Sequence, residues 1–322
     1  MRTTILMSLL LVVVLVSLSA YLRLAHSGIG CADWPDCYGR IGDAPTEAQT
    51  ISSENAYKRI VAEASQPLAW ATPLHRLVAS VLGLFIVGLV VLSLKAGKDR
   101  LLSLGLLGIT VFLALLGVKS GGLHNPAVVM GNLGGGFLML GLLGWMFFKS
   151  AGGEDDPGQT RSLPLSLIIL AVCVLVLQIL MGGLTSANFA ATACQSLPDC
   201  HGAWLPGPDL ITAMDLSRQL EVTSMGQAIG GQERTDIHIA HRLGAIVTTL
   251  LVLTVGLMAW RVGGRFRLTG GLVLALVAAE FSIGIASVAT GLPIGLAVAH
   301  NWVAGLLLLA MLKITALETY HR

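Results

Sequence analysis

The chain has 322 residues, of which 54% are hydrophobic and only 12% are charged, and its mean hydropathy is +0.78. A soluble globular domain does not tolerate so apolar a composition, so the chain is a membrane protein. The formal net charge is +2, and the basic residues are scattered rather than gathered in one patch. This pattern excludes nucleic acid as a partner.

Eight apolar runs are long enough to cross the hydrocarbon core, which takes about 20 helical residues. Lys and Arg gather in the connections on one side, and the positive-inside rule makes that side cytoplasmic. The long segments 23–71 and 185–236 then face outward, and both termini are cytoplasmic. The sequence predicts an all-α, multi-pass protein of a bacterial inner (plasma) membrane, with spans near Thr4–Leu22, Thr72–Leu94, Leu101–Val118, Pro126–Phe148, Leu163–Leu184, Ile237–Trp260, Leu268–Thr290 and Leu296–Ala316.

Several motifs occur twice. "CADWPDCYGR" at 31–40 is similar to "CQSLPDCHGA" at 194–203, and "HRLVA" at 75 recurs as "HRLGA" at 241. Such repeats indicate a tandem duplication. Because each unit crosses the membrane four times, we expect two four-helix bundles related by a pseudo-two-fold axis along the membrane normal. The predicted parts are an N-terminal half (1–148), a cytoplasmic linker (149–162) and a C-terminal half (163–322).

Four of the five cysteines lie in the outward segments, as two pairs with five residues between the partners. In an oxidising, periplasmic compartment this favours disulfides, Cys31 with Cys37 and Cys194 with Cys200, over free thiols or a metal pair. Closing so short a loop adds only about 2 kcal/mol to the free energy of unfolding, so each disulfide would fix a local turn rather than hold the fold together. Cys173 falls inside an apolar run and is expected in the core.

Ionisable side chains inside a bilayer need a partner or a function. Asp236 is expected to cap the sixth span, which places His241 about five residues inside it, and His300 lies about seven residues past Pro293. With a rise of about 1.5 Å per residue, the two histidines have matched depths. Two imidazoles at one depth can bind both faces of an iron porphyrin, so we predict bis-histidine haem ligation. The alternative is that each histidine only hydrogen-bonds to a neighbouring helix.

The first half does not repeat this pair. His75 matches His241, but Asn132 occupies the place of His300, and asparagine is a poor iron ligand. Either the halves have different functions or one site has decayed. His124, in a short outer link, is a substitute ligand or a solvated loop histidine.

Other polar residues have two interpretations each. His238 lies one turn before His241 and could contact a haem edge, or simply face water. Arg76 and Arg242 each follow a histidine and could pair with haem propionates, although interfacial snorkelling explains them as well. Glu280, expected to be buried, is either a proton carrier or a protonated, hydrogen-bonded group.

Four segments resemble the haem A synthase family of respiratory-oxidase assembly proteins: "RLAHSGIGCADWPDCYG", "GGLTSANFAATACQSLPDCHGAW", "IHIAHRLGA" and "GLAVAHNWVAGLLLLAML". The resemblance touches nearly the whole chain. It implies an oxidoreductase that converts a methyl group of haem O to the formyl group of haem A by successive hydroxylations. The C-terminal half would bind haem b as a cofactor between His241 and His300. The N-terminal half would bind haem O as the substrate, with His75 as the catalytic ligand.

The chain departs from the family pattern in its first half. Members typically begin the second span with Glu-x-x-His-Arg, whereas Thr72 stands at the glutamate position, and a second substrate-haem histidine is expected where Asn132 stands. A six-coordinate substrate haem therefore cannot form there on the family's ligand positions, unless His124 is recruited as the second ligand. A five-coordinate iron on His75 would keep the open position that oxidative chemistry can use.

Three functions follow from these features. The first is an active haem A synthase in the lipid bilayer, with haem O synthase as a candidate partner. The second is a non-catalytic haem b protein that assembles the oxidase or carries electrons. The third is a transporter whose histidines relay protons. The electron acceptor and any homo-oligomer are not specified by the sequence.

Overall fold

The computed structural model describes residues 1–26, 70–119, 126–150, 162–218 and 231–319. Over these ranges, eight helices are long and apolar enough to cross a membrane, and no strand occurs, which confirms the predicted all-α membrane architecture. The long helices are α1 (Arg2–His26), α3 (Ala71–Ala96), α4 (Arg100–Lys119), α5 (Pro126–Ser150), α6 (Leu165–Ala187), α8 (Gln232–Val262), α9 (Gly264–Ala289) and α10 (Ile294–Thr319). Two short helices, η2 (Ala190–Thr192) and α7 (Leu210–Met214), lie between α6 and α8.

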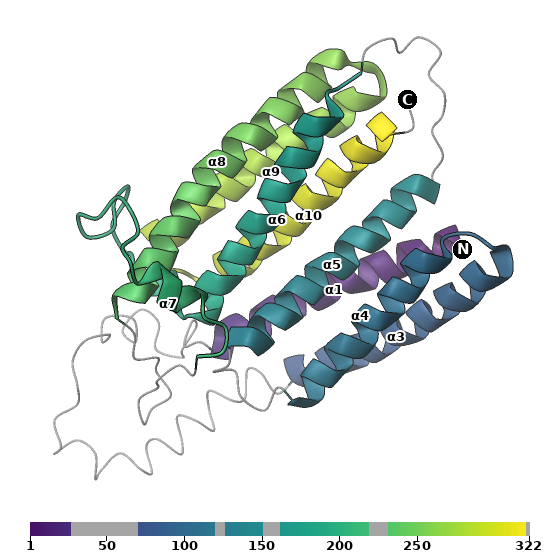
Figure 1. Ribbon diagram of the computed structural model, residues 1–322, viewed down its shortest axis with the longest axis horizontal. Helices are drawn as coiled ribbons and strands as arrows, with labels where there is room; N and C mark the ends of the chain where they lie inside the picture. The colour runs from purple at the N-terminus through teal and green to yellow at the C-terminus, as the bar shows by residue number, and fades with distance from the viewer. Residues whose placement is uncertain (27–69, 120–125, 151–161, 219–230, 320–322) are drawn as a thin grey trace.

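The long helices form two groups of four, which lie side by side in Figure 1. In the first group, α1 and α4 each pack against both α3 and α5, so α3 lies diagonally across from α5. In the second group, α6 and α9 each pack against both α8 and α10, so α8 lies diagonally across from α10. The groups meet mainly along α5 and α10. Both groups therefore have the same order of packing, as a tandem repeat requires; the symmetry axis itself stays a prediction.

One continuous cluster of buried hydrophobic side chains joins the two groups, from Ile5 of α1 to Ile314 of α10. Other large apolar side chains point outward: Leu84 is 73% exposed and Leu268 is 81% exposed. An apolar outer surface on helices whose backbone bonds are satisfied internally is what lipid contact requires. Cys173 of α6 is also exposed, so the expectation of a core cysteine was wrong. An apolar run does not reveal which of its faces meets lipid.

The two termini lie at the same end of the bundle, together with the α8–α9 connection, while α7 and the segment that precedes it lie at the opposite end (Figure 1). At the end with the termini, buried Glu318 accepts a hydrogen bond from the backbone N–H of Leu163, 2.8 Å from Oε2. The segment at the opposite end contains the predicted disulfide between Cys194 and Cys200. Cys31 and Cys37 lie outside the described residues.

The start of α8 differs from the prediction. The helix begins at Gln232, after Gly231, and Asp236 lies inside its second turn, fully buried. Asp236 is therefore no helix cap; its Oδ1 accepts a hydrogen bond from Nε2 of Gln232 at 3.0 Å. Because nothing between 232 and 236 breaks a helix, α8 extends about one turn farther outward than hydropathy indicates. His241 is consequently nine residues inside its helix rather than five.

Candidate functional site

The rings of His241 and His300 face each other inside the second group of helices. Their centroids are 6.4 Å apart, and their planes are perpendicular, at 90°. His300 lies six residues inside α10, three fewer than His241 in α8, and the rings still meet because α8 starts farther outward. Since α8 and α10 are diagonal partners, the two imidazoles lie between all four helices of the group. The structure thus brings together the two residues that the sequence paired.

A side-chain amide from α6 contacts the ring of His241. Nε2 of Gln178 lies 3.0 Å from Nδ1 of His241 and also donates to the backbone carbonyl oxygen of that residue at 2.9 Å. Gly244, one turn after His241, makes room for this contact, because a Cβ at that position would collide with the Gln178 amide. The absence of a side chain at the glycine of the "HRLGA" motif therefore leaves the space that the Gln178 amide occupies.

A carboxyl group from α9 lies beside the ring of His300. Oε1 of Glu280 is 3.2 Å from Nδ1 of His300, which is within ion-pair distance although the two atoms are not aligned as a hydrogen bond. Nδ1 of His300 and Oε2 of Glu280 are both buried, and neither has a hydrogen-bond partner in the described part of the chain. Buried polar atoms without partners are costly, so this arrangement needs an explanation beyond packing.

A glycine follows each of these polar side chains by one helical turn. A Cβ at Gly182 would lie 3.1 Å from Cε1 of His241, and a Cβ at Gly284 would lie 3.4 Å from Cε1 of His300. The four-residue spacing puts polar residue and glycine on one face of their helix. Each imidazole therefore lies beside a polar residue and a glycine of the neighbouring helix. These are Gln178 and Gly182 on α6 for His241, and Glu280 and Gly284 on α9 for His300.

The donor set suits an iron porphyrin better than a bare metal ion. In the described ranges, no three His, Cys, Asp or Glu side chains gather closely enough to hold a metal ion, whereas bare-ion sites use three or four protein ligands. Porphyrin iron needs only one or two axial side chains. With metal–nitrogen bonds of about 2 Å, opposite axial imidazoles have ring centroids roughly 6 Å apart. The observed separation of 6.4 Å is close to this value.

Two further residues that were predicted to contact haem form hydrogen bonds with the segment between α6 and α7. His238 is buried, and its Nδ1 lies 2.9 Å from the carbonyl oxygen of Ala190 in η2. The guanidinium of Arg242 donates to three carbonyl oxygens, those of Cys194 at 2.9 Å, Ser196 at 2.9 Å and Asp199 at 3.0 Å. These bonds hold the disulfide loop against α8, and haem contact by either residue stays a prediction.

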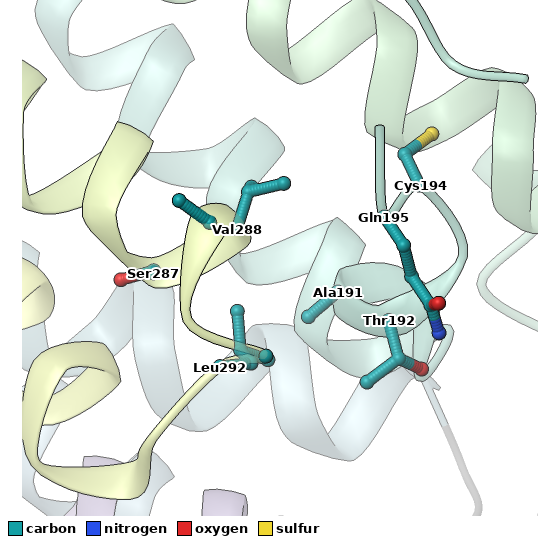
Figure 2. A pocket seen from close by; sticks show the side chains of 9 residues that line it. Ala191, Thr192, Cys194, Gln195, Ser287, Val288 and Leu292 are labelled. Atoms are coloured by element: carbon teal, nitrogen blue, oxygen red, sulfur yellow. The ribbon is translucent and has the colours of Figure 1, made fainter. Parts of the chain in front are cut away.

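A cavity of about 330 Å³ lies between this loop and the outer end of α9 (Figure 2). The loop contributes Thr192, Cys194 and Gln195 to its lining, and α9 with its link to α10 contributes Ser287 and Leu292. Ser287 lies three residues after Gly284, the glycine that contacts the His300 ring. The cavity is therefore on the outer side of the histidine pair.

The first half offers a different set of residues. His75, in the second turn of α3, and Asn132, in the second turn of α5, are both half-buried. No hydrogen bond or ring contact between these two is recorded in the structure as far as it is described. Thr72 is half-buried and Arg76 is exposed. His124 lies outside the described residues.

Sequence reasoning missed Gln178 and the glycines beside the two rings. A signal for Gln178 existed, because it is the one amide in the apolar run "LVLQILMGG" and a polar side chain within a span calls for a partner. The role of Gly244 could not be predicted, since it depends on how α6 is rotated toward α8.

The fold and the site define a multi-pass membrane protein with facing histidines suited to an iron porphyrin. A family model described as cytochrome oxidase assembly protein matches residues 2–312, and the chain belongs to this family. The chain is 34% identical to the protein named heme A synthase from Shewanella oneidensis, over 98% of this chain and 94% of the relative. Proteins with the same name from Nitrosospira multiformis and Shouchella clausii are 26% and 24% identical, over 93% and 92% of this chain and 87% and 89% of theirs.

This membership confirms the predicted family. The chain is an oxidoreductase and a multi-pass protein of the bacterial inner membrane.

Proposed function

We propose that the chain is a haem A synthase, which oxidises a methyl group of haem O to the formyl group of haem A. The observation that carries the proposal is the facing pair His241 and His300, 6.4 Å apart, in a chain similar over nearly its whole length to proteins named heme A synthase. A transporter pathway would not need two imidazoles at the separation of axial ligands.

In the C-terminal half, 163–322, Nε2 of His241 and Nε2 of His300 would hold haem b. When bound, haem b supplies one-electron transfer. Gln178 and Glu280 orient the two rings through their Nδ1 edges, and Gly182 and Gly284 give the rings room beside the helix backbone. The disulfide loop, held by Arg242 and His238, covers the outer side of the site and limits the access of water.

In the N-terminal half, 1–148, His75 would hold the iron of the substrate haem O. Two features of the chain support a five-coordinate substrate: the partner position has Asn132, and Thr72 replaces the carboxyl that the family pattern contains. The polar segment 149–162 joins the two halves. An open coordination position on the substrate iron would be accessible to the oxidant that the successive hydroxylations of the methyl group require.

The proposed orientation puts both termini in the cytoplasm and both cysteine segments in the periplasm. It is supported by the clustering of Lys and Arg at the connections and by the position of both termini at one end of the bundle, opposite the Cys194–Cys200 disulfide (Figure 1). Haem O, which is apolar, would reach the first half through the lipid bilayer or directly from haem O synthase.

The decisive experiment is haem extraction from cells that make haem O but lack their own haem A synthase. With this chain expressed, we expect a new haem A peak, and with His75→Ala we expect haem O alone. If the purified wild-type protein contains b-type haem but the cells make no haem A, the chain is instead a non-catalytic haem b protein. Protein that binds no haem at all would contradict both.

A further inference from the structure

Orienting the ring of His300 does not by itself require a carboxyl group at position 280. We propose that Glu280 is a positioning residue that acts through His300: it accepts a hydrogen bond from Nδ1–H of His300 and thereby lowers the reduction potential of the iron bound at Nε2. This inference rests on the proposed haem b site and adds to it the group that sets its potential.

The geometry points to Glu280 because the two groups are otherwise unpartnered. Oε1 lies 3.2 Å from Nδ1, and within the described residues neither Nδ1 of His300 nor Oε2 of Glu280 has a hydrogen bond. A carboxyl group within a membrane-spanning helix is expensive unless it has a partner. At 3.2 Å the two atoms are already within hydrogen-bond distance, and only their alignment differs from that of a hydrogen bond.

Ligation at Nε2 decides where the ring proton is. A neutral imidazole carries one proton, so a ring that binds iron through Nε2 has its proton on Nδ1 and needs an acceptor there. A carboxyl oxygen in that place fixes the ring and makes it a stronger electron donor. Stronger donation favours ferric over ferrous iron, which lowers the potential.

The opposite ligand has a weaker partner. Gln178 offers His241 a neutral amide, which must turn its oxygen toward Nδ1 to accept a hydrogen bond from Nδ1–H. In the structure its nitrogen instead faces both Nδ1 and the backbone carbonyl oxygen of His241. Of the two axial histidines, His300 is therefore the one whose neighbour controls the iron.

The first half lacks the same device. Counting back by the 167 positions that separate Gly117 from Gly284, the residue that corresponds to Glu280 is Leu113. Helix α4 thus keeps the glycine and has an aliphatic side chain in place of the carboxyl. The control of potential is specific to the half proposed to transfer electrons.

The test is a redox titration of the b-type absorbance in full-length purified protein. Relative to the wild type, we expect Glu280→Gln to lose about tenfold of the preference for ferric iron, by analogy with the effect that loss of a ligand's hydrogen-bond partner has on metal affinity. For one electron, tenfold corresponds to a shift of 59 mV toward positive potential. Gln178→Glu, which adds a carboxyl beside the other ring, should shift the potential in the negative direction.

Glu318→Gln is the matched control, because it makes the same change at a buried carboxyl near the far end of α10 and should leave the potential unchanged. Haem-loaded Glu280→Gln with the wild-type potential would overturn the proposal, as would an equal shift in Glu318→Gln. If Glu280→Gln retains no haem, Gln178→Glu decides, and the absence of a negative shift overturns the proposal. Wild-type protein without b-type haem would instead overturn the proposed function and this inference together.

Discussion

The two halves of the chain share a helix arrangement but differ in what fills it. In each half, four long helices pack in the same order around a diagonal pair. In the second half that diagonal pair carries two facing imidazoles, each with a polar neighbour and a glycine. The equivalent positions of the first half have aliphatic side chains. Counted from the nearest repeated residues, Leu15 corresponds to Gln178, Leu113 to Glu280 and Val78 to Gly244.

The difference shows that the fold does not need the polar interior. Apolar packing and satisfied helix backbones are enough to build a four-helix unit in lipid, and the first half has both. Polar groups within the membrane are costly, so their presence in one half and absence from the equivalent positions of the other fit the proposed division of roles. A site with fewer protein partners is also better suited to a substrate that must leave than to a permanent cofactor.

The largest expected effect comes from giving the second half the residues of the first. Gln178→Leu combined with Gly244→Val removes the amide beside His241 and fills the space that accommodates it. We expect haem b retention to fall about 1,000-fold, because loss of a metal ligand's partner typically costs about 10- to 100-fold and overpacking the site adds about 1–3 kcal/mol. The measurement is a haem titration of purified protein, with Thr254→Val on the exposed face of α8 as the control. If the double variant retains haem b as well as the wild type does, the difference between the halves at these two positions has no part in haem binding.

A smaller effect is expected from the two arginines that follow the repeated histidines. Arg242→Ala removes three charge-assisted hydrogen bonds to the disulfide loop, and we expect local opening of 194–203 to become easier by about 3 kcal/mol. Arg76→Ala, at the exposed equivalent in the first half, should leave that loop unaffected. Amide hydrogen exchange reports both, and equal exchange in the two variants would break the comparison.

The smallest of these effects is expected from the Cys194–Cys200 disulfide. Its closed loop is short, so reduction should destabilise the outer segment by about 2 kcal/mol and leave the helices intact. Because Arg242 and His238 also hold this segment, the helical circular dichroism of the protein should be the same before and after mild reduction. Loss of that signal would mean that the disulfide supports the whole bundle.

The sequence predicted the parts of the molecule that depend on hydropathy and repetition. All eight helices, the pairing of His241 with His300 and the second disulfide followed from run length, depth and compartment. What the sequence could not provide is the rotation of each helix about its own axis. The rotation determines that Cys173 lies on the outer face and that Gln178 and Glu280 lie beside the two imidazole rings. Hydropathy contains no information about it.

The predicted start of α8 was wrong for a related reason. Hydropathy marks where a helix enters lipid, not where its backbone hydrogen bonds begin. Residues 232–236 are polar, yet they continue the helix outward and bury Asp236 against Gly207. The predicted depth of His241 below the end of its helix was therefore about one turn too shallow, and its predicted match in depth with His300 does not hold, since His300 lies six residues inside α10.

Spectra of single-histidine variants test most directly whether a haem is held between His241 and His300 in the second half, without a contribution from His75. In purified protein, electron paramagnetic resonance should show a low-spin ferric haem in the wild type. We predict that His300→Ala abolishes this signal and that His75→Ala leaves it unchanged. A low-spin signal that survives in His300→Ala, or disappears in His75→Ala, would contradict the account.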